Sequence, residues 1–135
     1  MADAGLTPPL RELLELAERA RDNAYARYSN FRVGSALRSG SGRVYSGCNV
    51  ENASYGATLC AERSAIAAMV AAGDREVEAV AVFTDADPPS FPCGICRQVL
   101  LEFSGGKPLS IVAASPRAVR TTTLSELLPE PFILK

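Results

Sequence analysis

The sequence predicts an α/β fold in a single domain, because helical and strand-like patterns alternate along it and its size suits one core. Three segments have apolar residues at helical spacing, namely 8–24, 58–72 and 93–103. Four shorter segments have strand-like patterns, namely 31–37, 44–49, 77–84 and 109–114. The chain has 135 residues, of which 47% are hydrophobic and 21% charged, enough for one core. We therefore expect one domain over residues 1–135.

The first helix is predicted to begin at Pro8. Thr7 is a residue type that caps helices, and proline is favoured at the first helical position. Leu10, Leu13 and Leu14 then start an apolar stripe at helical spacing. In a small domain such a stripe normally packs on a sheet, so we assign it to the core.

A β-hairpin is expected next, with a turn at Gly40 to Gly42. Its second strand, Val44 to Asn49, leads into a segment that we place near one end of the sheet, where ligands commonly bind. Asn49 and Glu51 would share one face of this extended segment and offer amide and carboxylate groups to sugar hydroxyls. From composition alone, a solvated turn is an equally good interpretation of this segment.

The second and third helices are each predicted to begin with cysteine. Cys60 falls in the first turn of the helix expected at 58–72, and Cys93 and Cys96 fall in the first turn of the one at 93–103. The strand between them, 77–84, is apolar on both faces, as in a buried central strand. Two parallel helices beside this strand could point their N-termini at the same ion.

The end of the chain predicts one more strand and a short helix. Residues 109–114 form an apolar run, and Thr123 with Glu126 makes a capping box for a helix at 124–128. Residues 132–134 form an apolar tail, which would pack either on its own domain or on a neighbouring subunit.

Three cysteines and one glutamate predict a catalytic zinc site. Catalytic zinc usually has three protein ligands and an open fourth position, which Cys60, Cys93 and Cys96 would provide. The chain has no histidine, so an all-cysteine site is the one available. Glu62 lies two residues after Cys60, where it could shuttle protons beside the open position. A ligand, a spacer, a glutamate and then Pro-Cys-x-x-Cys is the signature of zinc-dependent nucleobase deaminases.

Three other kinds of protein could also explain all or part of this pattern. A structural zinc module would need a fourth ligand, for which Cys48 is the remaining thiol. A thiol redox protein could use Cys93 and Cys96, but it would leave Cys60 and Glu62 without a role. A related deaminase could act on another aminopyrimidine nucleoside or on a polynucleotide.

Charge and hydropathy limit which binding partners and which cellular location we expect for this protein. The formal net charge is −1 and the basic residues are scattered, so nucleic acid is not expected as a partner. No apolar run approaches the roughly 20 residues that span a bilayer, and no signal pattern appears at the N-terminus, so no membrane association is expected. We expect a cytoplasmic protein, where a reducing environment favours metal binding over disulfides.

Five stretches together resemble a known family. In order, FRVGSAL, GCNVENASYG, TLCAERSA, PCGICRQVLLEF and LLPEPF are similar to the small, homotetrameric, zinc-dependent cytidine deaminases of bacteria and eukaryotes. The resemblance implies a three-layer α/β/α fold with a mixed sheet of about five strands. It also implies a small-molecule nucleoside substrate and one Zn²⁺ per subunit. The implied reaction is hydrolysis of cytidine and 2′-deoxycytidine to uridine and 2′-deoxyuridine plus ammonia, in pyrimidine salvage.

The resemblance also suggests a role for each matched residue. The implied zinc ligands are Cys60, Cys93 and Cys96, with Glu62 as the proton shuttle and Arg63 as a hydrogen-bond donor to the ligand sulfurs. The implied substrate contacts are Phe31 packing on the pyrimidine, Asn49 and Glu51 on the ribose, and the Ala61 backbone on the base. Residues implied to complete an adjacent subunit's pocket are Ala53, Tyr55 and Phe132.

Overall fold

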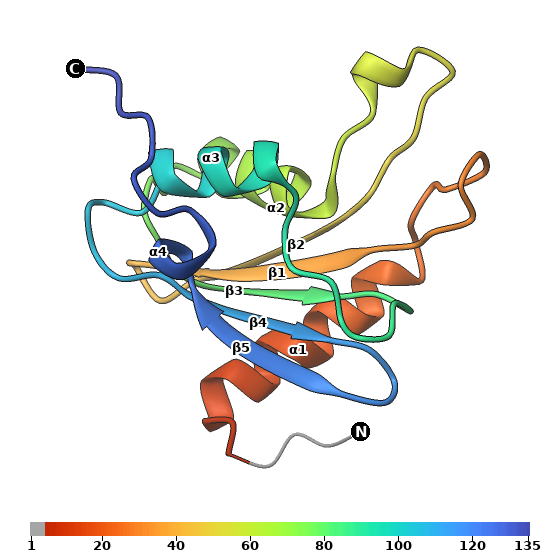
Figure 1. Cartoon of the computed structure of the whole chain (residues 1–135), viewed down its shortest axis with the longest axis horizontal. Coiled ribbons are helices and arrows are strands. Elements are labelled where there is room, and N and C mark those ends of the chain that lie inside the picture. Colours follow the sequence, from red (N-terminus) through yellow and green to blue (C-terminus); the bar gives the residue numbers. More distant parts are fainter. Residues whose placement is uncertain (1–4) are drawn as a thin grey trace.

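A mixed five-stranded sheet forms the middle layer of the computed structural model, which describes residues 5–135 (Figure 1). The strands are β1 (Gly34–Ser39), β2 (Val44–Cys48), β3 (Val77–Phe83), β4 (Ser110–Ala114) and β5 (Val119–Thr123). Their order across the sheet is β2-β1-β3-β4-β5. Only β3 and β4 run parallel among these neighbours, and the other three pairs are antiparallel. The predicted α/β fold with a mixed sheet of about five strands is therefore confirmed.

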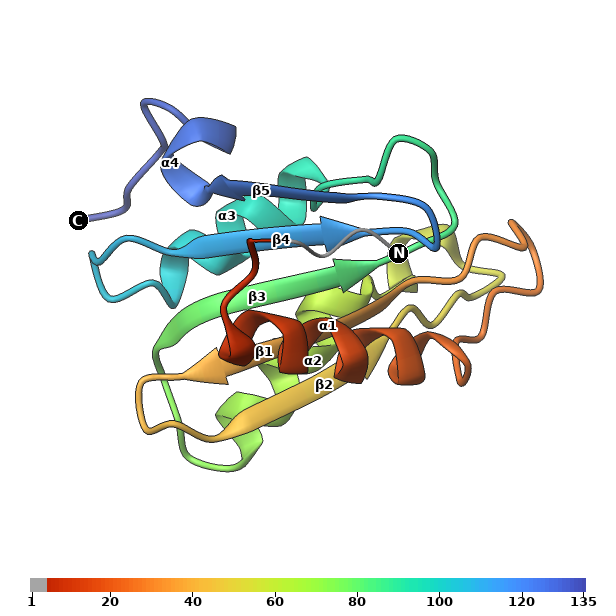
Figure 2. The same ribbon diagram turned by 90° about the horizontal axis from the view of Figure 1, so that it is seen from below.

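Helices cover both faces of this sheet. The helices are α1 (Pro8–Arg21), α2 (Ala61–Ala71), α3 (Gly94–Glu102) and α4 (Leu124–Leu127), with a short 3₁₀ helix at Tyr55–Ala57. Figure 2 shows α1 lying across one face, while α2 and α3 lie on the other. No helix within residues 5–135 is both long and apolar enough to cross a membrane.

The core has two parts because side chains alternate across each strand. Leu37, Val80 and Ile111 join the cluster under α2 and α3. Their sequence neighbours Ala36, Ala81 and Val112 join the cluster under α1. The stripe predicted for the first helix is part of this second cluster, since Leu13, Leu14 and Ala17 are all buried. Its assignment to the core is therefore confirmed.

The ends of the helices follow the predicted capping residues. Thr7 caps α1 by accepting a hydrogen bond from the Leu10 amide at 3.4 Å, and Pro8 is the first helical residue. Thr123 caps α4 by accepting from the Glu126 amide at 3.4 Å. Gly73 follows α2 with a φ of +101°, a conformation that glycine adopts without strain.

Two predicted boundaries are wrong, and one strand was missed. Phe31 lies in the loop before β1, because pairing with β2 and β3 begins only at Gly34. The helix expected from residue 58 begins at Ala61, because Leu59 is still extended and exchanges two backbone hydrogen bonds of 2.9 Å with Val50. The missed strand is β5, whose three consecutive threonines favour a strand without an apolar pattern.

Two glycines allow helices to approach the sheet closely. A Cβ atom added at Gly34 would lie 1.9 Å from the Ala17 carbonyl oxygen of α1. One added at Gly47 would lie 2.6 Å from the Ala65 amide nitrogen of α2. Because both contacts are with helix backbone, no side-chain rotation could relieve them.

We expect Gly34→Ala to lower the free energy of unfolding by about 1–3 kcal/mol or more, since overpacking would push α1 off the sheet. Urea unfolding of the two proteins measures the difference. Gly56→Ala is the control, because a Cβ there meets no atom within 4 Å. Equal unfolding midpoints for Gly34→Ala and the parent would show that α1 does not pack as described.

Candidate active site

Three thiols from two distant segments meet at one point. The Sγ atoms of Cys60, Cys93 and Cys96 all lie within 4.8 Å of one another, and those of Cys60 and Cys93 are 3.9 Å apart. Tetrahedral zinc with sulfurs at about 2.3 Å would hold them roughly 3.8 Å apart. The cluster therefore fits one zinc ion. Cys48 is not part of it, and no fourth metal-binding side chain joins it within residues 5–135.

Each cysteine is placed by the start of a helix. Cys60 is the N-cap of α2, Cys93 is the N-cap of α3, and Cys96 lies in the first turn of α3. The sequence predicted both Cys60 and Cys93 inside their helices, whereas each lies just before the first helical residue. The consequence is the same, because the positive ends of both helix dipoles face the sulfurs and favour thiolates.

Neighbouring groups favour the thiolate form of Cys60. The Cys96 thiol donates toward the Cys60 sulfur and, with Arg63 and Cys93, lowers the pKa of Cys60 to about 5, although burial opposes this shift. The pKa of Cys96 is raised, because its proton is held against the Cys60 sulfur and its side chain is buried. A cluster with a low-pKa thiol is suited to binding a metal ion, because the metal binds thiolates and its binding releases the remaining thiol protons to solvent.

Arg63 lies directly against the thiol cluster. Its Nη2 atom donates to the Cys60 sulfur at 3.3 Å and to the Thr58 carbonyl oxygen at 3.3 Å. These thiolates raise the pKa of Arg63, the hydrogen bond to Cys60 contributing most. The Nε atom of Arg63 is buried and has no hydrogen-bond partner in the structure. The guanidinium therefore has an unused donor within the wall of the site.

Glu62 is the buried carboxyl group of the site. It is 4% exposed, and burial is the main cause that raises its pKa to about 7. A carboxyl group with a pKa near neutrality can both accept and donate a proton under physiological conditions. Glu62 lines the same cavity as Cys60 and Cys93, so its protons can reach whatever binds there.

This cavity, of about 210 Å³, brings together most of the predicted substrate residues. The predicted residues that line it are Phe31, Asn49, Cys60, Ala61, Glu62 and Cys93. Sequence reasoning missed the other six, which are Val33, Thr58, Val82, Thr84, Ser90 and Phe91. Val82 and Thr84 could have been found from their position at the carboxyl end of a buried strand, where ligands commonly bind. Ser90 and Phe91 have no comparable signal beyond preceding Cys93.

Asn49 is a buried residue that holds the loop carrying Phe31. It is 8% exposed; its Oδ1 atom accepts from the Val33 amide at 2.8 Å, and its Nδ2 atom donates to the Phe31 carbonyl oxygen at 2.8 Å. Asn49 is thus not part of a solvated turn. Its side chain sets the position of Phe31 at the mouth of the cavity.

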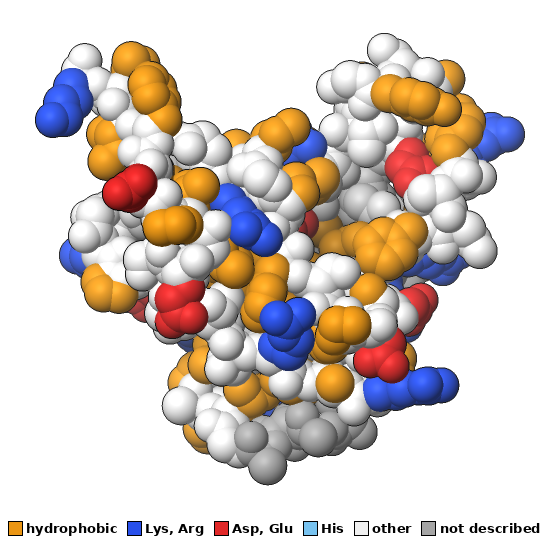
Figure 3. Space-filling model, in the orientation of Figure 1, with side chains coloured by type: hydrophobic (Ala, Val, Ile, Leu, Met, Phe, Trp, Pro, Cys, Tyr) orange, Lys and Arg blue, Asp and Glu red, His pale blue; other side chains and the backbone are white. Residues whose placement is uncertain are grey.

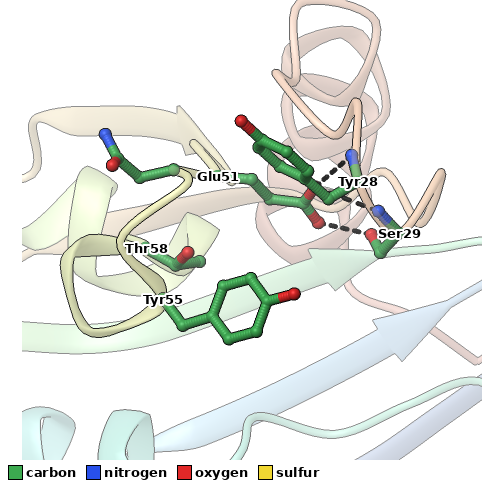
Figure 4. Close-up of a pocket in the computed structure, with 6 residues that line it drawn as sticks. Tyr28, Ser29, Glu51, Tyr55 and Thr58 are labelled. Carbon is green, nitrogen blue, oxygen red and sulfur yellow. Dashed lines mark hydrogen bonds between the residues drawn. The ribbon is translucent and has the colours of Figure 1, made fainter.

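Glu51, two residues after Asn49, contacts the same loop at Tyr28 and Ser29 (Figure 4). Its carboxylate accepts from the amides of Tyr28 at 2.9 Å and Ser29 at 3.1 Å, and from the Ser29 hydroxyl. The Ser29 hydroxyl is the main cause that lowers the pKa of Glu51, so the carboxylate stays ionised. Glu51 lines an adjoining hollow of about 260 Å³ that also includes Tyr55 and Thr58. Because Thr58 lines both spaces, the hollow adjoins the cavity.

The three residues assigned to a neighbouring subunit's pocket lie on the surface. Tyr55 is 82% exposed, Phe132 is 70% exposed, and Ala53 is also exposed. Figure 3 shows a hollowed surface between two projections that carry hydrophobic side chains. In Figure 1 these projections are the C-terminal tail and the loop before α2. None of the three residues lines the cavity at the thiols, so their assignment to another subunit stays a prediction.

Zinc content separates the three-thiol site from the structural zinc module that would recruit Cys48. We expect the parent protein to bind about one zinc per chain and Cys60→Ala to bind almost none, since two thiols hold zinc weakly. Cys48→Ala is the matched control and should keep the parental content, because its thiol lies outside the cluster. Inductively coupled plasma mass spectrometry after dialysis measures both. Loss of zinc from Cys48→Ala would contradict the three-thiol site.

Known proteins with the same sequence pattern and structure are cytidine deaminases. A cytidine deaminase of Sporosarcina psychrophila is 41% identical over 123 residues, which cover 91% of this chain and 90% of that protein. One from Mycobacterium tuberculosis is 45% identical over 116 residues, covering 86% and 84%. The crystal structure of cytidine deaminase from Burkholderia pseudomallei superposes with a TM-score of 0.86 at 46% identity, covering 94% of this chain and all of that one.

The match to a family model shows where the shared region lies. Residues 8–111 match the model of the cytidine and deoxycytidylate deaminase zinc-binding region. This range includes α1, the thiol cluster and strands β1 to β3, and it contains every residue that lines the cavity. The chain therefore belongs to the zinc-dependent cytidine and deoxycytidylate deaminase family.

Proposed function

We propose that this protein hydrolyses cytidine and 2′-deoxycytidine to uridine and 2′-deoxyuridine, releasing ammonia, with residues 1–135 acting as one domain. In this reaction water adds to C4 of the cytosine ring, the C4–N4 bond breaks, and oxygen remains on C4. The observation that carries the proposal is that Glu62 lines the same cavity as Cys60 and Cys93, two of the three clustered thiols. Family membership and the cytidine deaminase relatives support it.

The thiols of Cys60, Cys93 and Cys96 would hold the zinc ion. When bound, zinc supplies a Lewis acid that lowers the pKa of a water molecule in the cavity. Three thiolates give this centre a net negative charge, which weakens that effect. Arg63 offsets part of this charge by donating a hydrogen bond to the Cys60 sulfur. The N-termini of α2 and α3 offset more of it, because the positive ends of their dipoles lie beside the sulfurs.

Glu62 moves the protons. It accepts one from the attacking water and delivers it to N3 of the ring as oxygen bonds to C4. It then takes the second proton from the new C4 hydroxyl and transfers it to the leaving amine. Burial supports this cycle, because it raises the pKa of Glu62 to about 7 and makes both directions of transfer accessible. The same burial keeps bulk water from competing for those protons.

The cavity wall provides contacts for base and sugar. Phe31 packs on the pyrimidine, and the Ala61 backbone contacts the base with an amide that has no partner inside α2 because it lies in the first turn. Asn49 and Glu51 contact the ribose hydroxyls through donor and acceptor positions that their hydrogen bonds to residues 28–33 leave unused. A carboxylate can accept about four hydrogen bonds, and the structure uses three on Glu51.

The proposed active unit is a homotetramer in which Ala53, Tyr55 and Phe132 complete the pockets of adjacent subunits. Its support is exposed apolar surface, since Tyr55 and Phe132 are 82% and 70% exposed and Ile133 and Leu134 are 59% and 85% exposed. Side chains of this kind are normally covered by a partner. We place the enzyme in the cytoplasm, in pyrimidine salvage, acting on free nucleosides because its basic residues are not clustered.

The reaction is tested by incubating zinc-loaded protein with cytidine and following ultraviolet absorbance and ammonia in one sample. We expect the cytidine band to disappear with equimolar ammonia. Glu62→Gln should keep its zinc but lower kcat by about 10²–10⁴-fold, because the amide cannot shuttle protons. Intact cytidine and deoxycytidine with folded, zinc-loaded protein would refute the substrate, and near-normal turnover by Glu62→Gln would place the shuttle elsewhere.

Arg63→Ala tests the charge argument separately. We expect zinc to remain bound while kcat falls roughly 10- to 100-fold, since the ligand sulfurs lose their hydrogen-bond donor. Arg63→Lys should recover only part of the activity, because the Nη2 atom of arginine donates to both Cys60 and Thr58, whereas lysine offers a more strongly hydrated ammonium on a flexible stem. Unchanged kcat in Arg63→Ala would remove the proposed role.

A further inference from the structure

Part of the cavity wall belongs to a proline-rich loop that has few backbone hydrogen-bond donors. This loop, residues 84–93, joins β3 to α3 and brings Ser90 and Phe91 to the cavity. Pro88, Pro89 and Pro92 have no amide hydrogen, so they cannot form the backbone hydrogen bonds that fix most loops. Their carbonyl groups remain available as acceptors, and side chains from other elements use two of them.

Two arginines from outside the loop donate to those proline carbonyls. Arg97 of α3 donates through Nε to the Pro92 carbonyl oxygen at 2.7 Å. Arg120 of β5 donates through Nη1 to the Pro89 carbonyl oxygen at 3.1 Å. The stretch 89–92 is therefore held at both of its ends, with Ser90 and Phe91 between the two anchored carbonyls.

Arg120 makes a second contact, directly with the cavity wall. Its guanidinium carbon lies 4.3 Å from the centroid of the Phe91 ring, a cation–π geometry. One side chain thus binds both the ring that lines the cavity and the backbone carbonyl two residues before it. Phe91 also packs against the core cluster under α2 and α3, so the ring is held between that core and Arg120.

We propose that Arg120 is a positioning residue for the substrate cavity, acting through Phe91 and the Pro89 carbonyl. The role rests on the proposed function, because its effect is on how well the cavity holds the nucleoside. Arg120 itself does not line the cavity, so it contacts no substrate. Without Arg120, the Phe91 side chain could occupy more rotamers, and the cavity wall would be less well defined. We expect this to weaken nucleoside binding more than it slows the chemical step.

Steady-state kinetics on cytidine test this role. Arg120→Ala should raise KM about two- to fivefold, the range of an exposed cation–π contact, with kcat and zinc content near those of the parent. Arg120→Lys should recover part of the affinity, because lysine keeps the cation over the ring but cannot donate as a planar fork. In a Phe91→Leu background, Arg120→Ala should raise KM by a smaller factor than in the parent, since the ring contact is already gone and the Pro89 hydrogen bond is what remains to be lost.

Arg117→Ala is the matched control. Arg117 also reaches this loop, through a 4.0 Å ion pair with Asp87, but its side chain is 83% exposed and neither residue lines the cavity. It should leave KM at the parental value. Melting temperatures identify any variant that is simply less stable, in which case Arg120→Lys and the Phe91→Leu cycle decide the question.

Three results would overturn the role of Arg120. They are a parental KM for Arg120→Ala, an equal rise in KM for Arg117→Ala, and full additivity of Arg120→Ala with Phe91→Leu. A parent protein that leaves cytidine intact would remove both this role and the proposed function. A parent that turns cytidine over, together with any of the three results, would remove the role alone.

Discussion

The site depends on the meeting of two helix N-termini beside one buried strand. Strand β3 lies in the centre of the sheet, and α2 precedes it while α3 follows it, so both helices lie on the same face (Figure 1). This arrangement brings the caps Cys60 and Cys93 to a 3.9 Å separation of their sulfurs. Negative charge on three clustered thiols would otherwise be costly to bury, and the two helix dipoles reduce that cost.

The remaining parts of the cavity are loops held by side chains rather than by the sheet. Asn49 bonds the Phe31 carbonyl oxygen and the Val33 amide, and Glu51 caps the turn at Tyr28 and Ser29. Arg97 and Arg120 hold the proline-rich loop. Such side-chain bonds give loops a defined shape where regular backbone pairing is absent, and precise positioning of binding groups needs this kind of support.

The sequence predicted the local features well because their causes are local. The caps at Thr7 and Thr123, the glycine after α2 and the Cys-x-x-Cys pair in α3 each depend on residues within one or two turns. The predictions were wrong where a residue far away in the sequence determines the local structure. Residues 58–60 stay extended because Leu59 pairs with Val50, and Phe31 stays in a loop because Asn49 holds it there.

The sequence by itself therefore identified the candidate chemical groups: three thiols and a glutamate in the order of the deaminase signature, with an arginine next to the glutamate. Tertiary structure alone decided which groups surround that chemistry. Ser90 and Phe91 enter the cavity, and Arg120 reaches Phe91 from an edge strand that has no apolar pattern. The physical reason is that metal-ligand spacing is encoded between near neighbours, whereas a cavity wall is formed by packing between segments far apart in the chain.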